Sequence, residues 1–400
     1  MLYFLLYQNN IKISENNLKL VIRNNEQELE PIISFSIRNY LNNSKKLICD
    51  YSQQWDTFKK YTNPYEFIHT TIPNYNISIS KIKPVSRSYF KMIEICRTFN
   101  LLYNDYKYIN TFHLAEGPGG FIEAMAHLRN NKNDTYYGMT LIDNSNHSIP
   151  GWKKTENFIK KYPNVVLETG DTGNGDLFDE NNFIYCKNKY GNSMHLVTAD
   201  GGFDFSANYN EQENLAFRLI FTQIAYALIL QKYNGTFILK IYDVFHKTTI
   251  EMLYFLNSFY KQVYITKPNT SRYANSEKYI VCKFFKFNNI EHISKKLFNI
   301  LKLLNNIDFN KYKIHSMLDI NISLYHNTQL EEINSILGKQ QIENILNTIK
   351  LISYKERKKD KLENIKTQNI QKCINWCINN NVPYNNNLET TNIFLNRRNH

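Results

Sequence analysis

The sequence of 400 residues is poor in cysteine, proline and glycine, of which it contains 6, 9 and 13. Its six cysteines are scattered along a long chain, unlike the disulfide framework of a small secreted domain. The one close pair, Cys373 and Cys377, lies one helical turn apart and lacks a second pair at metal-binding spacing, which favours helix packing over a zinc site. We therefore expect a protein of a reducing compartment that binds no metal.

The hydrophobic pattern of the sequence also predicts neither a signal sequence nor a membrane-spanning segment. Residues 1–7 are apolar, but they have no basic flank and are too short for a signal sequence. The longest apolar helix, expected at 215–230, contains Arg218 and Gln223, which indicates a buried core helix rather than a membrane span. We expect a soluble protein with no membrane partner.

Acidic residues are the scarcer charge, with 36 Asp and Glu against 48 Lys and Arg, a net charge of +12 and a pI near 9.1. This excess favours a polyanionic partner, RNA or DNA first and an anionic membrane second. An A+T-rich genome also produces such an Asn-, Lys-, Ile- and Tyr-rich chain, so part of the charge can be incidental. The length predicts one large domain with extensions, or two domains.

Residues 112–125 form the most informative stretch, in which an apolar strand is followed by Glu116, a turn with Gly117, Gly119 and Gly120, and an apolar-faced helix. Glycines let a ligand approach the backbone closely, and the helix start offers unpaired N–H groups. The spacing is neither that of a dinucleotide site nor that of a P-loop. Because the Glu116 carboxylate would repel a phosphate but suits ribose hydroxyls, we expect an adenosine-type cofactor. A glycine-rich turn without a ligand is the alternative.

From residue 111 onward, expected strands alternate with expected helices, which predicts a parallel sheet. After residue 288 the sequence becomes Asn- and Lys-rich and reads as helical, with a charge run at 355–361 and a basic end at 396–400. Before residue 50, short alternating strands are expected. The expected strands are 11–14, 18–22, 111–115, 136–141, 165–167, 195–199, 235–242, 263–265 and 278–285, the last two as an antiparallel edge pair, and the main helices are 86–99, 119–129, 151–162, 215–230 and 249–260.

Three ionisable residues occupy unusual positions in these elements. Asp200 follows a buried strand, where parallel sheets place their sites. Lys240 interrupts an otherwise apolar strand, and since a buried ammonium is costly unless paired, we favour a functional role. Lys91 lies near the apolar face of a helix that Ser86 can cap, where a snorkelling lysine is the simpler interpretation.

Three polar segments also stand out. Residues 55–66 mix aromatic and basic side chains that can stack bases and hold phosphates, although a helix with an aromatic inner face is commoner. The glycine-rich loop 170–176 carries Asp171 and Asp176, which can accept from an adenine amino group or cap the next helix. The loop 267–277 contains more hydrogen-bonding groups than a turn requires.

Taken in order, Lys91, Asp200, Lys240 and Glu277 and their flanking sequences resemble the FtsJ/RrmJ-type S-adenosylmethionine-dependent RNA 2′-O-methyltransferases with their Lys-Asp-Lys-Glu tetrad. Gly-Met-Thr-Leu and Thr-Ser-Arg-x-Ala-Asn-Ser-Glu-Lys-Tyr make the chain most similar to the mRNA cap branch, which includes the Adrift type. The resemblance covers roughly residues 55–290. The matching segments are 63–66, 86–94, 114–121, 138–141, 196–203, 235–242 and 267–282.

The resemblance implies an α/β Rossmann-like methyltransferase fold, with a mostly parallel seven-stranded sheet, an antiparallel edge strand and helices on both faces. It implies an N-terminal extension at 1–54, a methyltransferase domain at 55–290 and a helical, basic C-terminal region at 291–400. The implied activity is methylation of the first or second transcribed nucleotide of capped mRNA, with S-adenosyl-L-methionine as cofactor. An rRNA or tRNA 2′-O-methyltransferase and a catalytically silent RNA-binding subunit are the alternatives.

The resemblance also implies partners and a compartment. The implied partner is RNA, the 5′ end of capped mRNA, together with the capping or transcription machinery. The composition, in a relative of the cap branch, suggests a large cytoplasmic DNA virus. The expected location is then the cytoplasm, in a viral factory or virion, and the nucleus for a cellular protein.

By the same resemblance Lys240 is the proton acceptor, Lys91 and Glu277 orient the hydroxyl and tune Lys240, and Asp200 pairs with the lysine near the sulfonium methyl. A lysine acts as a base only with a depressed pKa, which a second ammonium and burial both favour. Ser271 and Arg272 are implied contacts to the RNA backbone. The implied cofactor-binding residues are Glu116, Gly117, Gly119, Gly120, Thr140, Asp171 (with Asp176 in reserve) and Asp200.

Overall fold

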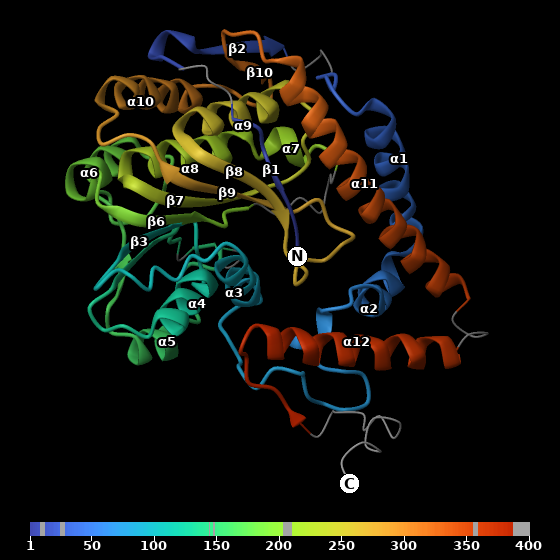
Figure 1. The fold of residues 1–400 in the computed structure, drawn as a ribbon. Coiled ribbons are helices and arrows are strands. Elements are labelled where there is room, and N and C mark those ends of the chain that lie inside the picture. The colour runs from blue at the N-terminus through green and yellow to red at the C-terminus, as the bar shows by residue number, and fades with distance from the viewer. Residues whose placement is uncertain are drawn as a thin grey trace.

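The centre of the molecule is an eight-stranded sheet with the strand order β1-β8-β9-β7-β6-β3-β4-β5 (Figure 1). The computed structural model describes residues 1–8, 13–24, 29–143, 145–146, 149–202, 210–354 and 359–386. The strands are β1 Leu2–Leu5, β3 Asn110–Leu114, β4 Thr135–Met139, β5 Val165–Glu168, β6 Met194–Ala199, β7 Gln231–Ile241, β8 Tyr260–Lys267 and β9 Lys278–Phe285.

The parallel part of the sheet is β5-β4-β3-β6-β7, and helical crossovers connect its strands as parallel pairing requires. The Rossmann-like α/β class is therefore confirmed, with one strand more than the predicted seven. The additional strand, β1, pairs antiparallel with β8 through Phe4 and Ile265. The antiparallel strand β9 lies inside the sheet rather than at its edge, because it is hydrogen-bonded to both β7 and β8.

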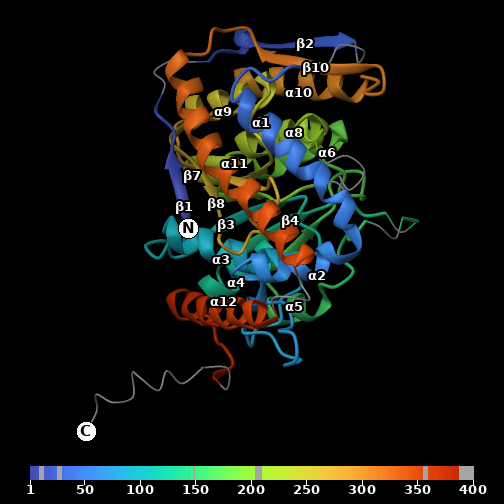
Figure 2. The same ribbon diagram turned by 90° about the vertical axis from the view of Figure 1, so that its right-hand side faces the viewer.

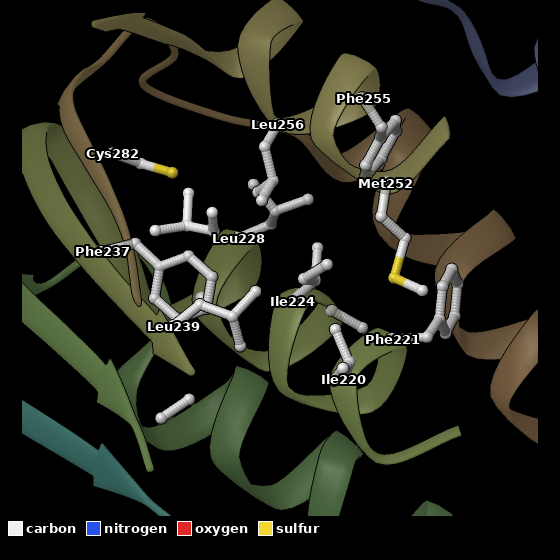
Figure 3. Packing of buried hydrophobic residues seen from close by; sticks show 14 of the residues in the cluster. Ile220, Phe221, Ile224, Leu228, Phe237, Leu239, Met252, Phe255, Leu256 and Cys282 are labelled. Atoms are coloured by element: carbon white, nitrogen blue, oxygen red, sulfur yellow. The ribbon is translucent and has the colours of Figure 1, made fainter. Parts of the chain in front are cut away.

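Helices cover both faces of the sheet (Figure 1). The helix α8, Phe217–Leu230, is buried along its length except at Arg218, as predicted for a core helix. Figure 3 shows its residues Ile224 and Leu228 packed towards Phe237 and Leu239 of β7. In the described ranges, every helix is too short or too polar to cross a membrane. One face carries α6 Glu180–Tyr190, α8, α9 Lys247–Phe259 and α10 Glu291–Asn305, and the other α3 Ser88–Thr98, α4 Gly120–Arg129 and α5 Glu156–Lys161.

The N- and C-terminal segments pack on this core and on each other. The helices α1 Phe35–Leu47 and α11 Leu324–Ser353 lie side by side, next to α2 Ser52–Thr62 (Figure 2). The predicted strand at 18–22 exists as β2, Leu18–Asn24, and it pairs with β10, Tyr312–Leu318, inside the region expected to be wholly helical. Local sequence does not reveal β10, because its partner lies almost 300 residues away.

The last described helix, α12 Lys359–Asn379, packs against the face that carries α3. Cys373 and Cys377 are both buried there, in agreement with helix packing. Trp376 contacts Phe90 of α3 edge-to-face, with 6.0 Å between the ring centroids. The three-part division at residues 54 and 290 stays a prediction, although packing crosses both boundaries. Residues 11–12, 203, 355–358 and 396–400, which belong to segments discussed above, lie outside the described residues.

Two helix starts differ from expectation. The helix α3 begins at Ser88 with Arg87 before it, and Ser86 is not its cap, since the Ser86 hydroxyl bonds the Ser88 hydroxyl at 2.5 Å. The helix expected from residue 151 begins only at Glu156, because residues 151–154 form turns. Both differences leave the order of elements as predicted.

Candidate active site

The four predicted tetrad residues meet at one end of the sheet. Asp200 follows β6 and Lys240 lies on the parallel neighbour β7, so the two side chains end side by side, with Lys240 Nζ 3.2 Å from Asp200 Oδ1. Lys91 on α3 reaches Glu277, which precedes β9, with 2.7 Å between Nζ and Oε1. These side chains are 8–15% exposed. The sequence-predicted residues therefore form two mostly buried ion pairs, and Lys91 is not a snorkelling surface lysine.

A tyrosine that sequence reasoning missed links the two pairs. The Tyr279 hydroxyl donates to Asp200 Oδ1 at 2.7 Å, and Lys91 Nζ lies 3.4 Å from the same hydroxyl and 5.7 Å from the ring centroid. Tyr279 is fully buried and is the direct ladder partner of Lys240. Tyr279 lies two residues after Glu277, and residues two apart in an extended chain share a face. That spacing could have indicated that Tyr279 belongs to the site.

The charges of the site reinforce one another. Burial raises the pKa of Glu277, but Lys91 and Lys240 outweigh it and hold that pKa well below the usual range. Burial lowers the pKa of Lys240, yet the Asp200 carboxylate overcomes this and holds the pKa above its ordinary value. The expected depressed pKa of Lys240 is thus wrong for this structure. The physical reason is that its nearest charge is a carboxylate, whereas the second ammonium, on Lys91, is taken by Glu277.

The three glycines of the 117–120 turn are each required by packing within the protein. A Cβ at Gly117 would lie 2.6 Å from the carbonyl oxygen of Gly151, and one at Gly119 would lie 2.8 Å from the Phe158 ring. Gly119 also has a φ of +106°, which favours glycine. A Cβ at Gly120 would lie 2.1 Å from a serine hydroxyl at the start of α3. These contacts fix the turn beside α3, the helix that carries Lys91. Direct contact of the glycines with a cofactor stays a prediction.

Glu116 is the buried carboxyl group of this turn. Its Oε1 accepts from the Phe121 N–H at 2.5 Å and so caps the start of α4. Its Oε2 is buried and has no hydrogen-bond partner within the described part of the chain. Burial, together with the nearby Asp200 carboxylate, raises the pKa of Glu116 well above its usual value. An unpartnered buried oxygen of this kind fits a ligand hydroxyl, so the residues present are compatible with an adenosine-type cofactor.

Thr140 connects the glycine turn to the loop after β5. Its side chain would meet a Cβ at Gly117 at 3.1 Å, and its carbonyl oxygen would meet one at Gly175 at 2.1 Å. The carboxyl ends of β3, β4 and β5 therefore bring all three segments together. Asp171 is exposed in the loop, whereas Asp176 Oδ1 accepts from Phe178 N–H at 2.9 Å within the turn. Neither aspartate caps the next helix, α6, because Asp179 occupies its N-cap and accepts from Asn181 N–H. The adenine contact of Asp171 stays a prediction.

The two predicted RNA contacts both have protein partners. The Ser271 hydroxyl donates to Glu277 Oε1 at 2.7 Å, and Ser271 is 2% exposed. Arg272 donates to both carboxylate oxygens of Glu66, at 3.1 and 2.6 Å. Their contact with RNA therefore stays a prediction, and the structure assigns each a bond inside the protein. In α2, the ring centroids of Phe58 and Tyr61 lie 6.2 Å apart and both side chains are half-buried, so a role of this helix in stacking bases stays a prediction.

Comparison with known proteins agrees with this site. The sequence model of a family described as FtsJ-like methyltransferase matches residues 84–285, about half of the chain, including all four tetrad residues. The chain belongs to the FtsJ-like methyltransferase family. S-adenosylmethionine is therefore its methyl donor, and it is an enzyme of the methyltransferase class.

Relatives of this FtsJ-like methyltransferase include a cap-specific mRNA (nucleoside-2′-O-)-methyltransferase of Autographa californica nuclear polyhedrosis virus, 37% identical over 198 residues, or 49% of this chain and 71% of that protein. A cap-specific mRNA (nucleoside-2′-O-)-methyltransferase 2 of Drosophila melanogaster is 28% identical over 62% of this chain, which spans only 36% of that longer protein. Among solved structures, one described as a ribosomal RNA methyltransferase from Plasmodium falciparum overlaps with a TM-score of 0.37 at 18% identity, covering 50% of this chain and 97% of that chain.

Proposed function

We propose that this enzyme methylates the ribose 2′-hydroxyl of the first or second transcribed nucleotide of capped mRNA. The observation that carries the proposal is the pair of buried ion pairs, Lys240 with Asp200 and Lys91 with Glu277, beside the glycine turn of an FtsJ-like fold. The viral relative, of which the chain covers 71%, supports capped mRNA as the substrate through its name.

The chemistry requires a ribose hydroxyl to lose its proton as it attacks. S-adenosylmethionine supplies, when bound, an electrophilic methyl group on a sulfonium. In this proposal Lys240 first releases its own proton to solvent and then accepts the hydroxyl proton. The sulfonium of bound S-adenosylmethionine would be a further positive charge near Asp200. It would compete with Lys240 for the Asp200 carboxylate and thereby lower the pKa of Lys240 towards the working pH. Lys91 and Glu277 hold the attacking oxygen in line, and positioning of this kind supplies a large share of the rate.

A cavity of about 220 Å³ beside the loop 267–277 supports the approach of RNA from that side. Its lining combines one aromatic ring, Trp55, with side-chain amides, groups that stack on bases and bond to RNA. The basic side chains of the lining, Lys45, Lys59 and Arg272, each pair with a carboxylate of the protein. We place the 5′ end of the RNA here. The lining residues from the loop 267–277 include Arg272, Asn275 and Ser276, the last of which directly precedes Glu277.

The finer biological setting follows from this proposal. An enzyme that modifies the first transcribed nucleotides works on RNA as soon as it is capped, so we propose the capping or transcription machinery as its surroundings. That places the enzyme in the cytoplasm, in a viral factory or virion, for a viral source, and in the nucleus for a cellular one.

The test is transfer of a radiolabelled methyl group to short RNAs that are identical except for the 5′ cap, followed by mapping of the labelled nucleotide. We expect label on the 2′-hydroxyl of nucleotide one or two of the capped RNA alone. Equal labelling of uncapped RNA would favour an rRNA or tRNA enzyme. Binding of RNA and S-adenosylmethionine without transfer would indicate a catalytically silent subunit.

A further inference from the structure

The loop between Lys267 and Lys278 carries Glu277, and its centre is held by a carboxylate from a distant part of the chain. Glu66, in the short helix η3 Glu66–Ile68, lies 206 residues before Arg272 in sequence. We propose that Glu66 is a positioning residue, which fixes Arg272 and thereby holds Glu277 in the geometry that catalysis requires. This inference rests on the proposed function, since it concerns the same site.

The contact between Glu66 and Arg272 is a two-point contact. Arg272 Nε donates to Oε2 at 3.1 Å and Nη2 donates to Oε1 at 2.6 Å, while the Glu66 side chain is 1% exposed. A bidentate guanidinium–carboxylate pair fixes orientation as well as distance. A second guanidinium, Arg87, lies 3.9 Å from Oε1 and donates to the Thr270 carbonyl oxygen at 3.1 Å. Glu66 thus holds two cations, of which Arg272 belongs to the loop and Arg87 bonds to the loop backbone.

The ionised state of Glu66 depends on these two arginines. Burial raises the pKa of Glu66, but the hydrogen bond from Arg272 and the charge of Arg87 lower it to about 2. A buried carboxyl group without such cationic partners would become neutral. The charge of Glu66 is therefore maintained by the groups that it positions.

Further bonds tie the backbone of the loop to its surroundings. Glu94, one helical turn after Lys91 on α3, accepts from Asn269 N–H at 2.9 Å. The Asn63 side chain accepts from Tyr273 N–H at 2.8 Å. These bonds hold the loop backbone on either side of Arg272. The Asn-Pro-Tyr-Glu segment at 63–66, which sequence analysis singled out, thus contacts the loop twice, through Asn63 and Glu66.

The path from Glu66 to the reacting centre is short. Ser271, the neighbour of Arg272, donates to Glu277 Oε1 at 2.7 Å, and the same oxygen lies 2.7 Å from Lys91 Nζ. Movement of Arg272 would therefore displace the Ser271 hydroxyl and change the Glu277–Lys91 pair. A displacement of about 1 Å in a positioned group costs on the order of 100-fold in rate.

The first experiment compares Glu66→Gln with Glu251→Gln in steady-state methyl transfer. Glu251 is a matched control, because it is equally buried and accepts from the Ser316 hydroxyl at 2.8 Å and the Met317 N–H at 2.6 Å, on β10. We expect Glu66→Gln to lower kcat by about 10- to 100-fold, with KM for S-adenosylmethionine within about 3-fold of wild type. A kcat equal to that of Glu251→Gln would overturn the inference.

The second experiment asks whether Glu66 acts through Glu277. In a Glu277→Gln background, adding Glu66→Gln should leave the residual kcat unchanged, since residues that act as one unit are non-additive. A further fall in kcat would show that Glu66 has a general structural role, and would contradict the proposal. Arg272→Lys keeps the charge but loses the two-point contact, and we expect its kcat to lie between those of wild type and Glu66→Gln. This variant tests the same contact if Glu66→Gln fails to fold.

Hydrogen exchange separates this inference from the proposed function. We expect amides 269–277 to exchange faster in Glu66→Gln than in Glu251→Gln, and this holds whatever RNA the enzyme methylates. Unchanged exchange in that loop would overturn the positioning role even if capped RNA is the substrate. A wild-type enzyme that methylates no RNA would instead overturn the proposed function.

Discussion

Each lysine of the tetrad is paired with one carboxylate, and Tyr279 joins the two pairs. At this scale the site is a balanced set of charges, in which Lys240, our proposed proton acceptor, begins in its protonated form. Under this proposal, Lys240 gives up a proton to solvent before it accepts one from the ribose hydroxyl. The residue identities made a lysine base plausible, but the Asp200 carboxylate at 3.2 Å determines its starting charge.

Replacement of Lys240 by alanine should abolish methyl transfer, because general-base catalysis contributes about 100- to 10,000-fold and no other group replaces the acceptor. Binding of S-adenosylmethionine, measured by calorimetry, should remain largely intact. Lys232→Ala, on the same strand but close to His195, is the control and should keep normal turnover. Wild-type turnover of Lys240→Ala on capped RNA would exclude the assigned role.

Removal of the Tyr279 hydroxyl should weaken catalysis without disturbing the core. Tyr279→Phe removes a bond to a charged carboxylate worth about 1–3 kcal/mol, so we expect kcat to fall about 10-fold or more. Tyr226→Phe is a matched control, since the Tyr226 hydroxyl is buried without a partner among the described residues. Equal kcat values for the two variants would argue against a link through Tyr279.

At the scale of elements, one buried carboxylate connects the N-terminal helix α1 to the sheet. Asp243, just after β7, accepts from Lys45 of α1 at 2.9 Å and from Lys278 of β9 at 3.1 Å. All three side chains are less than 10% exposed. The helix α1 is therefore ion-paired to Asp243 after β7, and the same carboxylate also holds Lys278, the residue that follows Glu277.

We expect Asp243→Asn to lower the free energy of unfolding by about 3–5 kcal/mol at pH 7, because it leaves two buried ammonium groups uncompensated. Urea denaturation measures this change. A loss below 1 kcal/mol would mean that α1 is held by its apolar contacts alone.

The same pair predicts a pH dependence in the wild type. Burial raises the pKa of Asp243, but Lys45 and Lys278 lower it from 3.8 to about 2. A group with a depressed folded pKa stabilises the protein above its unfolded pKa. That contribution, about 2 kcal/mol, is present above pH 3.8 and is lost as the pH falls towards 2. The fall should be smaller in Asp243→Asn.

At the scale of the whole molecule, the net charge of +12 favours a polyanionic substrate. RNA binding by such a surface releases counterions, so the logarithm of the affinity should fall linearly with the logarithm of the salt concentration, by about 0.7 for each phosphate neutralised. Filter binding over a salt series measures the slope, with S-adenosylmethionine affinity at the same salts as the control. A flat dependence would mean that the charge is incidental to RNA binding.

The sequence by itself determined the order of strands and helices from residue 111 to 285, the turn at 116–120 and the unusual positions of Asp200 and Lys240. These are local signals, because period-2 and period-3.6 patterns, glycine spacing and a lysine inside an apolar strand are each readable within a few residues. The family resemblance then joined Lys91, Asp200, Lys240 and Glu277 into one site. The structure brings those four together as two ion pairs.

Only the tertiary structure decided what those residues contact. Pairing of β1 with β8 and of β10 with β2 joins segments more than 250 residues apart, and no local pattern specifies such partners. The same holds for Glu66 and Arg272, for Tyr279 between the ion pairs, and for the carboxylate that raises rather than lowers the pKa of Lys240. Charge effects depend on distance and burial, and both are fixed by the packing of elements remote in sequence.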